Sequence, residues 1–521
     1  MAEITIPLVT VNSTRGPNAD DNLSLDSRII NGVISTTVNP ITRELDAFVE
    51  KRAGLTLRST TQVGSLTQAI YSSSLGNSTL TIHRNLTSGN QTIVSTNSAD
   101  TSSVIETLSV AQTPTADDIG LTHISEGIVG SNLTVFFSYG TPHNNNQNFF
   151  YSTSLIGGVS QATATNVPAR TSGPIIIMDG FVLALDYINS RIYQSSVDSI
   201  TNAWTAGYMP VNDYGDQVLM MLRSGRNIYV IGQASIEVFE NAGNPSGSIL
   251  KRIRSFAVKI GAQRISFCQA VSILDVIFFV GYQGGVFKIE ENGISKVSSS
   301  VVDAIMASSA AVLDSASTTT TAGSVHIDAF YYEGRPFLNI VGSTYQNYLT
   351  VNAEPTHQYT FWYDILNNMW TEQDFTISST ARVMRFSSGI RTRLTDAAPV
   401  STLGTIYKLD LASPVYQDDS GTMTLTIQLM RTTFGTGKNK IVHQCWLDAD
   451  EQASGITYLD FSDNDGTSFT THGQTFDMTN LDMPITGLGS HRGGRIYRLR
   501  HYSNTAWRGR ALRFKYTVGA S

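Results

Sequence analysis

Short apolar segments recur along the middle of the chain at a nearly constant spacing. Four of them begin at Val135, Val182, Ile228 and Val276, so that successive segments start 47, 46 and 48 residues apart. A period of this size is typical of β-propellers, in which each repeat is a four-stranded blade. The pattern therefore predicts a repeat architecture rather than an ordinary enzyme core.

Each apolar segment is followed by a polar turn and then by a run of alternating apolar and polar residues, as in a half-buried strand. In the repeat that begins at Val276, residues 286–289 form such a run. The pair Asn292-Gly293 then favours a tight hairpin turn and returns the chain as Ile294–Val297. One repeat thus supplies three consecutive strands. The phrase Asn-Ala-Trp-Thr at 202–205 also returns, as Asn-Met-Trp-Thr at 368–371.

These patterns divide the chain into three parts. We expect residues 1–60 to be an N-terminal arm with the first strands, because their few apolar positions need a partner surface. Residues 61–414 are predicted to form an all-β β-propeller of about six blades. From residue 415 the repeat is lost, and alternating runs such as 422–430 predict a C-terminal antiparallel β-sandwich over 415–521. Apolar residues between Ser298 and Val312 recur near helical spacing and predict one short helix.

Composition supports a folded, non-membrane protein. Of the 521 residues 41% are hydrophobic, only 15% are charged, and the net charge is −7. The longest apolar run, Val276–Val280, is too short to span a bilayer. No charged-then-apolar leader follows Met1, so neither a signal peptide nor membrane insertion is expected. The two cysteines, Cys268 and Cys445, are interpreted as buried thiols of a protein made in a reducing cytosol.

Residues 462–469, Ser-Asp-Asn-Asp-Gly-Thr-Ser-Phe, fit the Asp-box hairpin that sialidases and related propellers carry. The side chains of such a turn can hydrogen-bond its own backbone, while Gly466 takes the strained φ and Phe469 packs beneath. We therefore interpret the segment as a staple of the fold rather than as part of a glycosidase. A calcium loop is not predicted, because the twelfth position counted from Asp463 is Gln474 rather than an acid.

Other chemistry-bearing motifs do not occur in the sequence. There is no Gly-x-Ser-x-Gly elbow, no His-Glu-x-x-His, no phosphate-binding loop and no Cys-x-x-Cys. The acids form no diagnostic cluster of the kind that glycoside cleavage requires. We therefore predict that the protein is not an enzyme and has no cofactor, no catalytic residues and no metal site.

The stretch from His491 to Lys515 is rich in arginine and contains no acid. Residues two apart on a strand share one face, so several guanidinium groups should lie together. Such a strip could contact DNA phosphates without reading sequence, or bind acids of a neighbouring subunit. The acidic balance of the chain favours the subunit interface. The candidate residues are Arg492, Arg495, Arg498, Arg500, Arg508, Arg510 and Arg513.

Three groups of segments carry a resemblance to a known family. They are the opening segments 18–22, 28–33 and 51–55; residues 231–239 with 287–300; and, near the end, the turn 463–469 with the basic strand 495–500. Together they resemble the tail hub or nozzle proteins of short-tailed bacteriophages, which include the packaged-DNA stabilisation (head-completion) proteins. The resemblance covers most of the chain in layout and is specific over about a hundred residues.

The resemblance implies a structural virion protein of the phage tail, assembled in the host bacterial cytoplasm. It implies a homo-oligomer, expected as a ring of six below the portal and the head-to-tail adaptor ring. A tail needle or plug would close the ring, and spikes or fibres would attach near its upper rim. The ring would act as a nozzle for genome ejection and would help to retain packaged DNA, which it would not read by sequence.

The content of 35 Lys and Arg against 42 acids suits a channel wall that does not hold DNA. The alternative function is a sialidase-like or glycan-binding β-propeller, which the Asp-box and the aromatic content favour.

Overall fold

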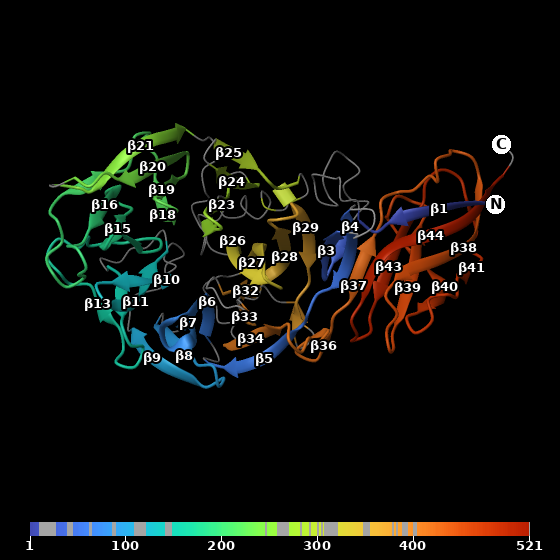
Figure 1. The fold of residues 1–521 in the computed structure, drawn as a ribbon, viewed down its shortest axis with the longest axis horizontal. Helices are drawn as coiled ribbons and strands as arrows, with labels where there is room; N and C mark the ends of the chain where they lie inside the picture. Colours follow the sequence, from blue (N-terminus) through green and yellow to red (C-terminus); the bar gives the residue numbers. More distant parts are fainter. Residues whose placement is uncertain are drawn as a thin grey trace.

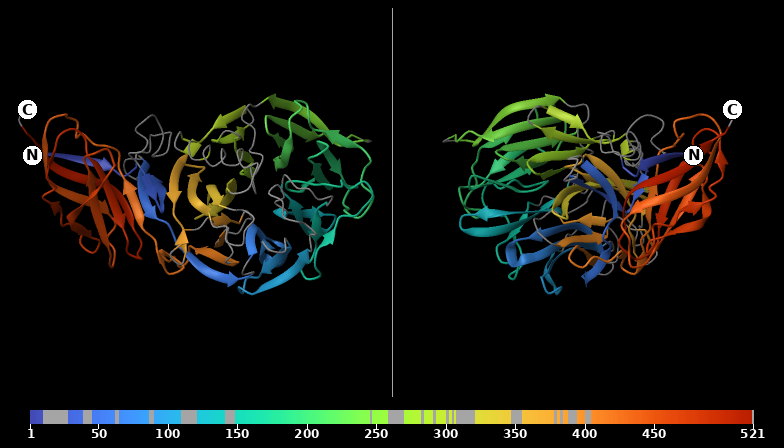
Figure 2. Two further views of the ribbon diagram at one scale, coloured as in Figure 1. Left: turned by 180° about the vertical axis from the view of Figure 1, so that it is seen from behind. Right: turned by 45° about the vertical axis from the view of Figure 1, so that its right-hand side comes forward.

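Strands make up nearly all of the secondary structure, and Figure 1 shows them as a ring of sheets with a second group of sheets beside it. The same side-by-side arrangement is seen from behind in Figure 2. The computed structural model describes residues 1–521 except 10–27, 39–44, 62–64, 86–89, 109–120, 141–147, 245–246, 258–269, 282–283, 291–292, 300–301, 304–305, 307–320, 347–354, 378–379, 382–383, 388–393, 400–403 and 520–521. Among the described residues, no helix has the length and hydrophobicity needed to span a bilayer.

The ring is built from four-stranded antiparallel units that follow one another in sequence. The first three are β6 (Ser65–Ser73), β7 (Ser78–Asn85), β8 (Gln91–Thr96) and β9 (Ser102–Leu108); β10 (Leu121–Val129), β11 (Asn132–Tyr139), β12 (Phe150–Ser152) and β13 (Ser160–Gln161); and β14 (Ile176–Met178), β15 (Phe181–Asp186), β16 (Arg191–Gln194) and β17 (Tyr208–Pro210). A short 3-10 turn, η2 (Leu75–Asn77), joins β6 to β7.

The next three units repeat this layout. They are β18 (Val218–Ser224), β19 (Asn227–Gly232), β20 (Ser235–Asn241) and β21 (Leu250–Ala257); β22 (Ala270–Ile273), β23 (Val276–Val280), β24 (Val286–Glu290) and β25 (Gly293–Lys296); and β26 (Thr321–Tyr332), β27 (Arg335–Gln346), β28 (Pro355–Asp364) and β29 (Met369–Gln373).

The seventh unit joins strands from distant parts of the chain. It contains β32 (Met384–Phe386), β33 (Leu394–Pro399), β34 (Thr405–Asp410) and β5 (Leu55–Thr60). The first strand of every unit contacts the first strand of the next, and β32 contacts β6, so the ring is closed. The described residues thus contain seven four-stranded units, against about six expected, because β5 of the N-terminal region completes the last one.

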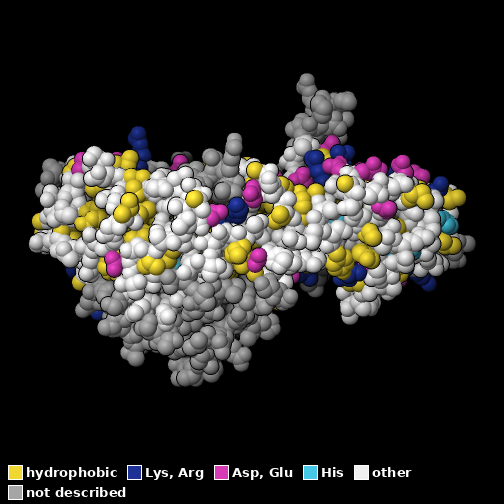
Figure 3. Space-filling model, turned by 90° about the horizontal axis from the view of Figure 1, so that it is seen from below, with side chains coloured by type: hydrophobic (Ala, Val, Ile, Leu, Met, Phe, Trp, Pro, Cys, Tyr) yellow, Lys and Arg dark blue, Asp and Glu magenta, His cyan; other side chains and the backbone are white. Residues whose placement is uncertain are grey.

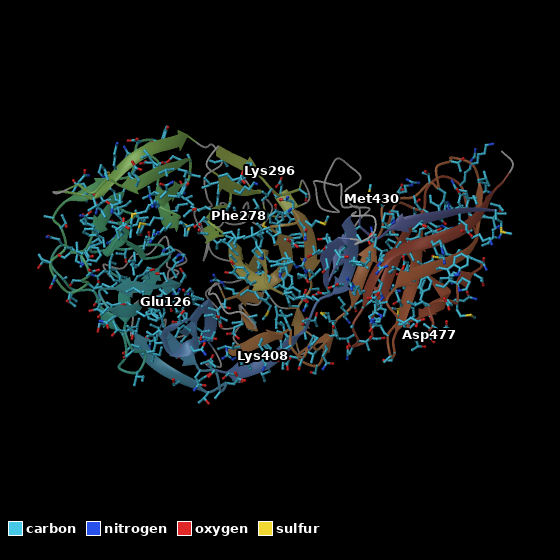
Figure 4. All side chains as sticks on the ribbon, viewed as in Figure 1. Glu126, Phe278, Lys296, Lys408, Met430 and Asp477 are labelled. Atoms are coloured by element: carbon cyan, nitrogen blue, oxygen red, sulfur yellow. The ribbon has the colours of Figure 1, made fainter. Side chains whose placement is uncertain are left out.

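The four apolar segments that carry the sequence period are β11, β15, β19 and β23, the second strands of four successive units. Val135, Phe136 and Phe137 of β11 are fully buried. Val135 and Phe137 face the core shared with the first unit, and Phe136 faces the core shared with the third. Phe278 of β23, labelled in Figure 4, packs in the corresponding core between the fifth and sixth units. A strand buried on both faces reads as a continuous apolar run, so the predicted all-β propeller is confirmed.

Two features predicted from the sequence lie partly outside the residues that the structure describes. The hairpin between β24 and β25 is found, but Glu290 pairs with Gly293, so Gly293 begins β25 instead of standing in the turn as predicted; residues 291 and 292 lie outside the described residues. The short helix expected between Ser298 and Val312 also lies almost entirely outside them.

The second part of the molecule consists of two sheets over one shared core, and we call it the two-sheet unit. One sheet contains β1 (Ala2–Pro7), β3 (Gly32–Val38), β4 (Leu45–Lys51), β44 (Arg508–Val518), β38 (Lys440–Ala449), β41 (Ile485–Thr486) and β42 (Ser490–His491). The other contains β2 (Arg28–Ile30), β37 (Leu425–Gln428), β43 (Ile496–His501), β39 (Ile456–Ser462) and β40 (Thr470–Asp477). Buried residues from both, such as Val49, Leu459 and Phe514, form the core between them. We interpret this unit as the predicted sandwich.

The N-terminal segment pairs with the C-terminal end rather than standing alone. Strand β1 lies antiparallel to β44, and β2 lies antiparallel to β37. Strand β2 also pairs in parallel with β29, so one continuous sheet runs from the sixth unit of the ring into the two-sheet unit. Both chain ends lie at the far side of the two-sheet unit (Figure 1). The division into domains at residues 60 and 414 stays a prediction. Two short hairpins, β30 (Thr376–Ile377) with β31 (Thr380–Ala381) and β35 (Gln417–Asp418) with β36 (Gly421–Thr422), complete the strands.

A buried arginine fastens the junction between the ring and the two-sheet unit. Arg52 is fully buried and donates two hydrogen bonds to Asp418, of 2.9 and 2.7 Å. It also donates to the side chain of Asn31 and to the main-chain oxygen of Asp374, and its guanidinium lies 4.2 Å from the ring centre of Phe375. Because these partners come from three separate segments, one side chain holds the two parts together.

A second buried arginine fastens the closing strand of the ring. Arg58 of β5 donates to Asp396 of β33 at 2.6 Å, to Thr79 of β7 at 2.6 Å and to Asp100 at 2.6 Å. Both Arg58 and Asp396 are almost fully buried. The seventh and first units are therefore joined by charge as well as by strand pairing.

Replacing Arg58 by methionine should lower the free energy of unfolding by about 3–5 kcal/mol, because it leaves the Asp396 carboxylate buried without its partner. Urea unfolding measures this change. The double variant Arg58→Met/Asp396→Leu should recover much of the loss, since it removes the stranded charge. A single variant as stable as the parent protein would show that the pair does not close the ring.

Candidate functional site: the arginine strip

The seven arginines of the candidate strip are divided between the two sheets of the two-sheet unit. Arg498 and Arg500 lie on β43, whereas Arg508, Arg510 and Arg513 lie on β44 of the opposite sheet. Arg492 and Arg495 precede β43. The sequence therefore brings these residues close along the chain, but the fold does not gather them into one surface.

On β43, two arginines share one carboxylate. Asp460 of β39 is fully buried and stands opposite Arg498 in the strand register. It accepts a hydrogen bond of 2.8 Å from Arg498 and bonds of 2.5 and 2.8 Å from Arg500. Aromatic rings cover the same guanidinium groups, with Phe469 3.9 Å from Arg498 and Tyr502 5.2 Å from Arg500. Both guanidinium groups thus bind one carboxylate of the same chain.

The same contacts lower the pKa of the Asp460 carboxyl. Burial works to raise the pKa of this carboxyl, but hydrogen bonds from Arg500, Thr471 and Arg498 outweigh burial and hold the pKa below its ordinary value. Asp460 therefore stays charged under all but strongly acidic conditions. An acid whose pKa is lower in the folded state than in the unfolded state stabilises the fold when it is ionised. This contribution is complete above the unfolded-state pKa and is lost as the pH falls through the folded-state pKa.

Arg495 is also bound internally, and its partner comes from the Asp-box segment. It is buried and donates to both oxygens of Asp463, at 2.7 and 2.8 Å. The turn holds itself together as predicted, because Ser462 accepts a hydrogen bond from the main-chain N–H of Gly466 at 3.0 Å. Phe469 differs from the expectation: instead of packing beneath the turn, it stacks against Arg498. The segment acts as a staple between neighbouring strands.

The arginines on β44 are more exposed to solvent. Arg508 pairs with Glu50 of β4 at 2.9 Å, whereas Arg510 and Arg513 are exposed. Their guanidinium groups lie over aromatic rings, Arg510 4.6 Å from Phe48 and Arg513 5.2 Å from Trp446. Within the part of the chain that the structure describes, neither Arg510 nor Arg513 nor the exposed Arg492 has an acid in ion-pair range. Only these three of the seven remain available to a partner.

Sequence reasoning did not find the acids that neutralise the other arginines. The missed residues are Asp460, Asp463 and Glu50. A usable signal existed for Asp460, since an acid at the centre of an alternating apolar strand needs a cationic partner when it is buried. Nothing in the sequence shows which strand lies beside it.

A cleft beside the junction gathers further ionisable groups. Glu50, Lys51, Tyr332, Glu333 and Arg508 all line it. Burial, and then the charge of neighbouring Arg52, lower the pKa of Lys51 to about 7, while burial and then Glu50 raise the pKa of Glu333. The Lys51 ammonium donates a 2.8 Å hydrogen bond to the main-chain oxygen of Ser503, so it also holds a loop. In the described chain, no three His, Cys, Asp or Glu side chains are placed to hold a metal ion.

The surface seen edge-on in Figure 3 carries small, separated groups of basic and acidic side chains on a mostly uncharged polar background. No basic groove crosses the part of that face that the structure describes.

Comparison with known proteins places this fold in a family. Residues 92–326 match the model of the family Phage_stabilise, described as bacteriophage P22 Gp10, beta-propeller. The class that the fold and this match define is a structural β-propeller protein of the phage virion, with a role in the tail. The matched segment, which runs from β8 to β26, belongs to the phage stabilisation family, and the resemblance seen in the sequence is confirmed.

Other comparisons are more distant. Among solved structures, YCF48 from Cyanidioschyzon merolae has a TM-score of 0.40 and 10% identity, covering 67% of this chain and 97% of that chain. A protein from Bacteroides fragilis has a TM-score of 0.31 and 10% identity, covering 56% of this chain and 81% of that chain. Curated proteins gave no match. Likenesses at this level say nothing about function.

Replacing Asp460 by asparagine should destabilise the protein at neutral pH, because the charge that holds Arg498 and Arg500 is lost. The difference from the parent protein should begin to shrink as the pH falls below about 4, the ordinary pKa of aspartate in an unfolded chain, and should disappear only below the lowered folded-state pKa, where the parent carboxylate is neutral too. Urea unfolding at a series of pH values tests this. A stability difference that does not change with pH would contradict the proposed role of the carboxylate.

Reversing Arg498 and Arg500 to glutamate tests the strip as an internal fastener. Three carboxylates would then crowd together, one of them buried, so we expect a loss of about 3 kcal/mol or more in the free energy of unfolding. The exposed Arg492→Glu provides a matched control that should melt like the parent. If the double variant melts like the control and only self-association fails, the sequence-based interface interpretation of Arg498 and Arg500 stands instead.

Proposed function

We propose that the protein forms the nozzle of a short phage tail. Six copies would make a ring below the portal and the adaptor ring, through which the genome leaves. The ring would also help to retain packaged DNA, with a needle or plug closing its end and spikes or fibres near its rim. The observation that carries the proposal is the match of residues 92–326 to the phage stabilisation family, which spans the second to fifth units of the ring.

The proposal places the DNA between copies and not along the axis of one propeller. Innermost strands of the ring carry buried polar side chains, among them Gln68 of β6, Asp328 of β26 and Arg385 of β32. Arg385 binds Asp328 at 2.9 Å and donates to the main-chain oxygen of Gln68. His123 of β10 lies nearby, and burial followed by the charge of Arg385 lowers its pKa to about 3. This bonded cluster supports a propeller that is a solid block.

Charge supports the same role. A wall that neutralised many phosphates would bind the duplex in a salt-dependent way and slow its passage. Here four of the seven arginines in the strip are bound to acids of the same chain, which removes them from any DNA path. We propose that the protein assembles in the host cytoplasm, contacts DNA without sequence recognition, and uses neither an enzyme activity nor a cofactor.

Electron microscopy of the purified protein in negative stain tests the proposal. We expect annular particles with sixfold symmetry at high protein concentration. Phage particles made without the protein should package DNA and then lose it, as measured by nuclease-sensitive DNA outside the capsid. A monomer that cleaves a fluorogenic glycoside would reject the nozzle in favour of the sialidase-like alternative.

A further inference from the structure

One face of the two-sheet unit presents cations that have no ion-pair partner among the described residues. It is the outer face of the sheet around β44, formed by Phe48, Trp446, Arg510, Arg513 and Lys515, and we call it the β44 face. In the strand register Arg513 stands opposite Trp446 of β38 on one side and Thr5 of β1 on the other. The inward side chains of β44, such as Leu512 and Phe514, belong to the core.

Aromatic rings restrict the position of these two guanidinium groups before a partner binds. The Arg510 guanidinium lies 4.6 Å from the ring centre of Phe48, and that of Arg513 lies 5.2 Å from Trp446. A guanidinium held over a ring loses less freedom when a partner binds, so more of the contact energy is kept. Arginine and large aromatic residues are also the residues that dominate protein interfaces.

The charges around the β44 face favour a protein partner over DNA. Glu3 stands opposite Lys515 in the register, Asp448 stands opposite Ala511, and Glu50 pairs with Arg508. Acids interspersed among the cations would repel a duplex, which presents a uniform row of phosphates. A protein surface that combines separate acids with apolar side chains can complement such a face at each position.

The chain itself carries a surface of that kind on the ring. The turns between the first and second strands of the units lie at one end of the ring, and the loop between β16 and β17 packs against the Gly180 turn of the third unit; we call this surface the turn face. Three large apolar side chains are exposed to solvent on this face: Ile128 is 63% exposed, Val197 57% and Leu274 54%. The exposed acids Asp198 and Asp275 directly follow the last two in sequence.

Neighbouring turns on this face are in contact, so the acids and apolar side chains share one surface, which also carries the exposed Arg223 and Arg226 at the turn of the fourth unit. A Cβ on Gly130 would lie 3.3 Å from the main-chain oxygen of Asp198, which places the β10–β11 turn of the second unit beside the β16–β17 loop of the third. In the fourth unit, Gly225 donates a hydrogen bond of 3.0 Å to the Asp275 carboxylate of the fifth. Asp179 of the third unit is a further exposed acid.

We infer that the β44 face of one copy docks on the turn face of a second copy, with Arg510 and Arg513 meeting its acids and the half-buried Trp446 meeting its apolar side chains, while the buried Phe48 supports Arg510 from beneath. The two surfaces belong to opposite parts of the chain, so the contact is head-to-tail, and repeated contacts of this kind close into rings. The inference rests on the proposed function for the ring itself, and adds the two surfaces that build it.

The test is charge reversal on the β44 face, with self-association measured by sedimentation velocity over a range of protein concentrations. Arg510→Glu/Arg513→Glu should weaken association by at least about tenfold, because like charges would then face each other. Melting should not change, since both side chains are exposed. Arg492→Glu, an exposed arginine outside the β44 face, is the matched control and should associate like the parent.

The opposite surface is tested by Asp198→Asn/Asp275→Asn. Both positions have positive φ, of 54° and 57°, which asparagine tolerates, so the turns should keep their shape while losing their charge. These variants should also weaken association, and combining them with the arginine reversals should cost less than the sum of the two effects. Additive effects, or variants that associate normally, would overturn the inference.

Two outcomes separate the inference from the proposed function. If the parent forms rings and Arg510→Glu/Arg513→Glu forms them equally well, the nozzle stands and the assigned surfaces are wrong. If the parent stays monomeric at all concentrations, both fail. Loss of salt-dependent binding to a duplex oligonucleotide, with self-association unchanged, would assign the β44 face to DNA and overturn the inference.

Discussion

The fold depends on the return of the N-terminal segment to the C-terminal end of the chain. Strand β5 supplies the fourth strand of the last unit, and Arg58 binds it to Asp396 and Thr79 on either side of the closure. A few residues earlier, Arg52 binds Asp418 at the junction with the two-sheet unit. Closing a ring over so long a separation carries a large entropic cost, which strand pairing and buried ion pairs must offset together. Without these contacts the first and last units would present open sheet edges.

Arginine has two different uses in this protein. Where it is buried, as at Arg52, Arg58 and Arg495, its planar group bridges segments that are distant in sequence through several hydrogen bonds at once. Where it is exposed, as at Arg510 and Arg513, it lies on an aromatic ring and is free to meet a partner. Buried arginines therefore join distant segments into one block, whereas Arg510 and Arg513 have no ion-pair partner among the described residues.

The sequence predicted what depends on local pattern. Strands β11, β15, β19 and β23 are buried on both faces, so their apolar runs and spacing gave the propeller directly. The seventh unit was not predictable in this way, because β5 lies about 350 residues before its partner β34 in the sequence. The same limit applied to the candidate site. Arg498 and Asp460 are 38 residues apart, and only the register of β39 against β43 makes them partners. Their pairing binds Arg498, one member of a strip expected to face outward, to an acid of the same chain.

The match of residues 92–326 to the phage stabilisation family supports a structural role in the phage tail, and the nozzle proposal depends on where the chain lies within the particle. Cryo-electron microscopy of intact particles, at a resolution that traces the chain, measures that position directly. We expect the protein as a ring between the adaptor and the end of the tail, with the DNA path between copies and the axis of each propeller filled by its own side chains. Density for DNA along the axis of a single propeller, or a chain located away from the tail channel, would contradict the nozzle.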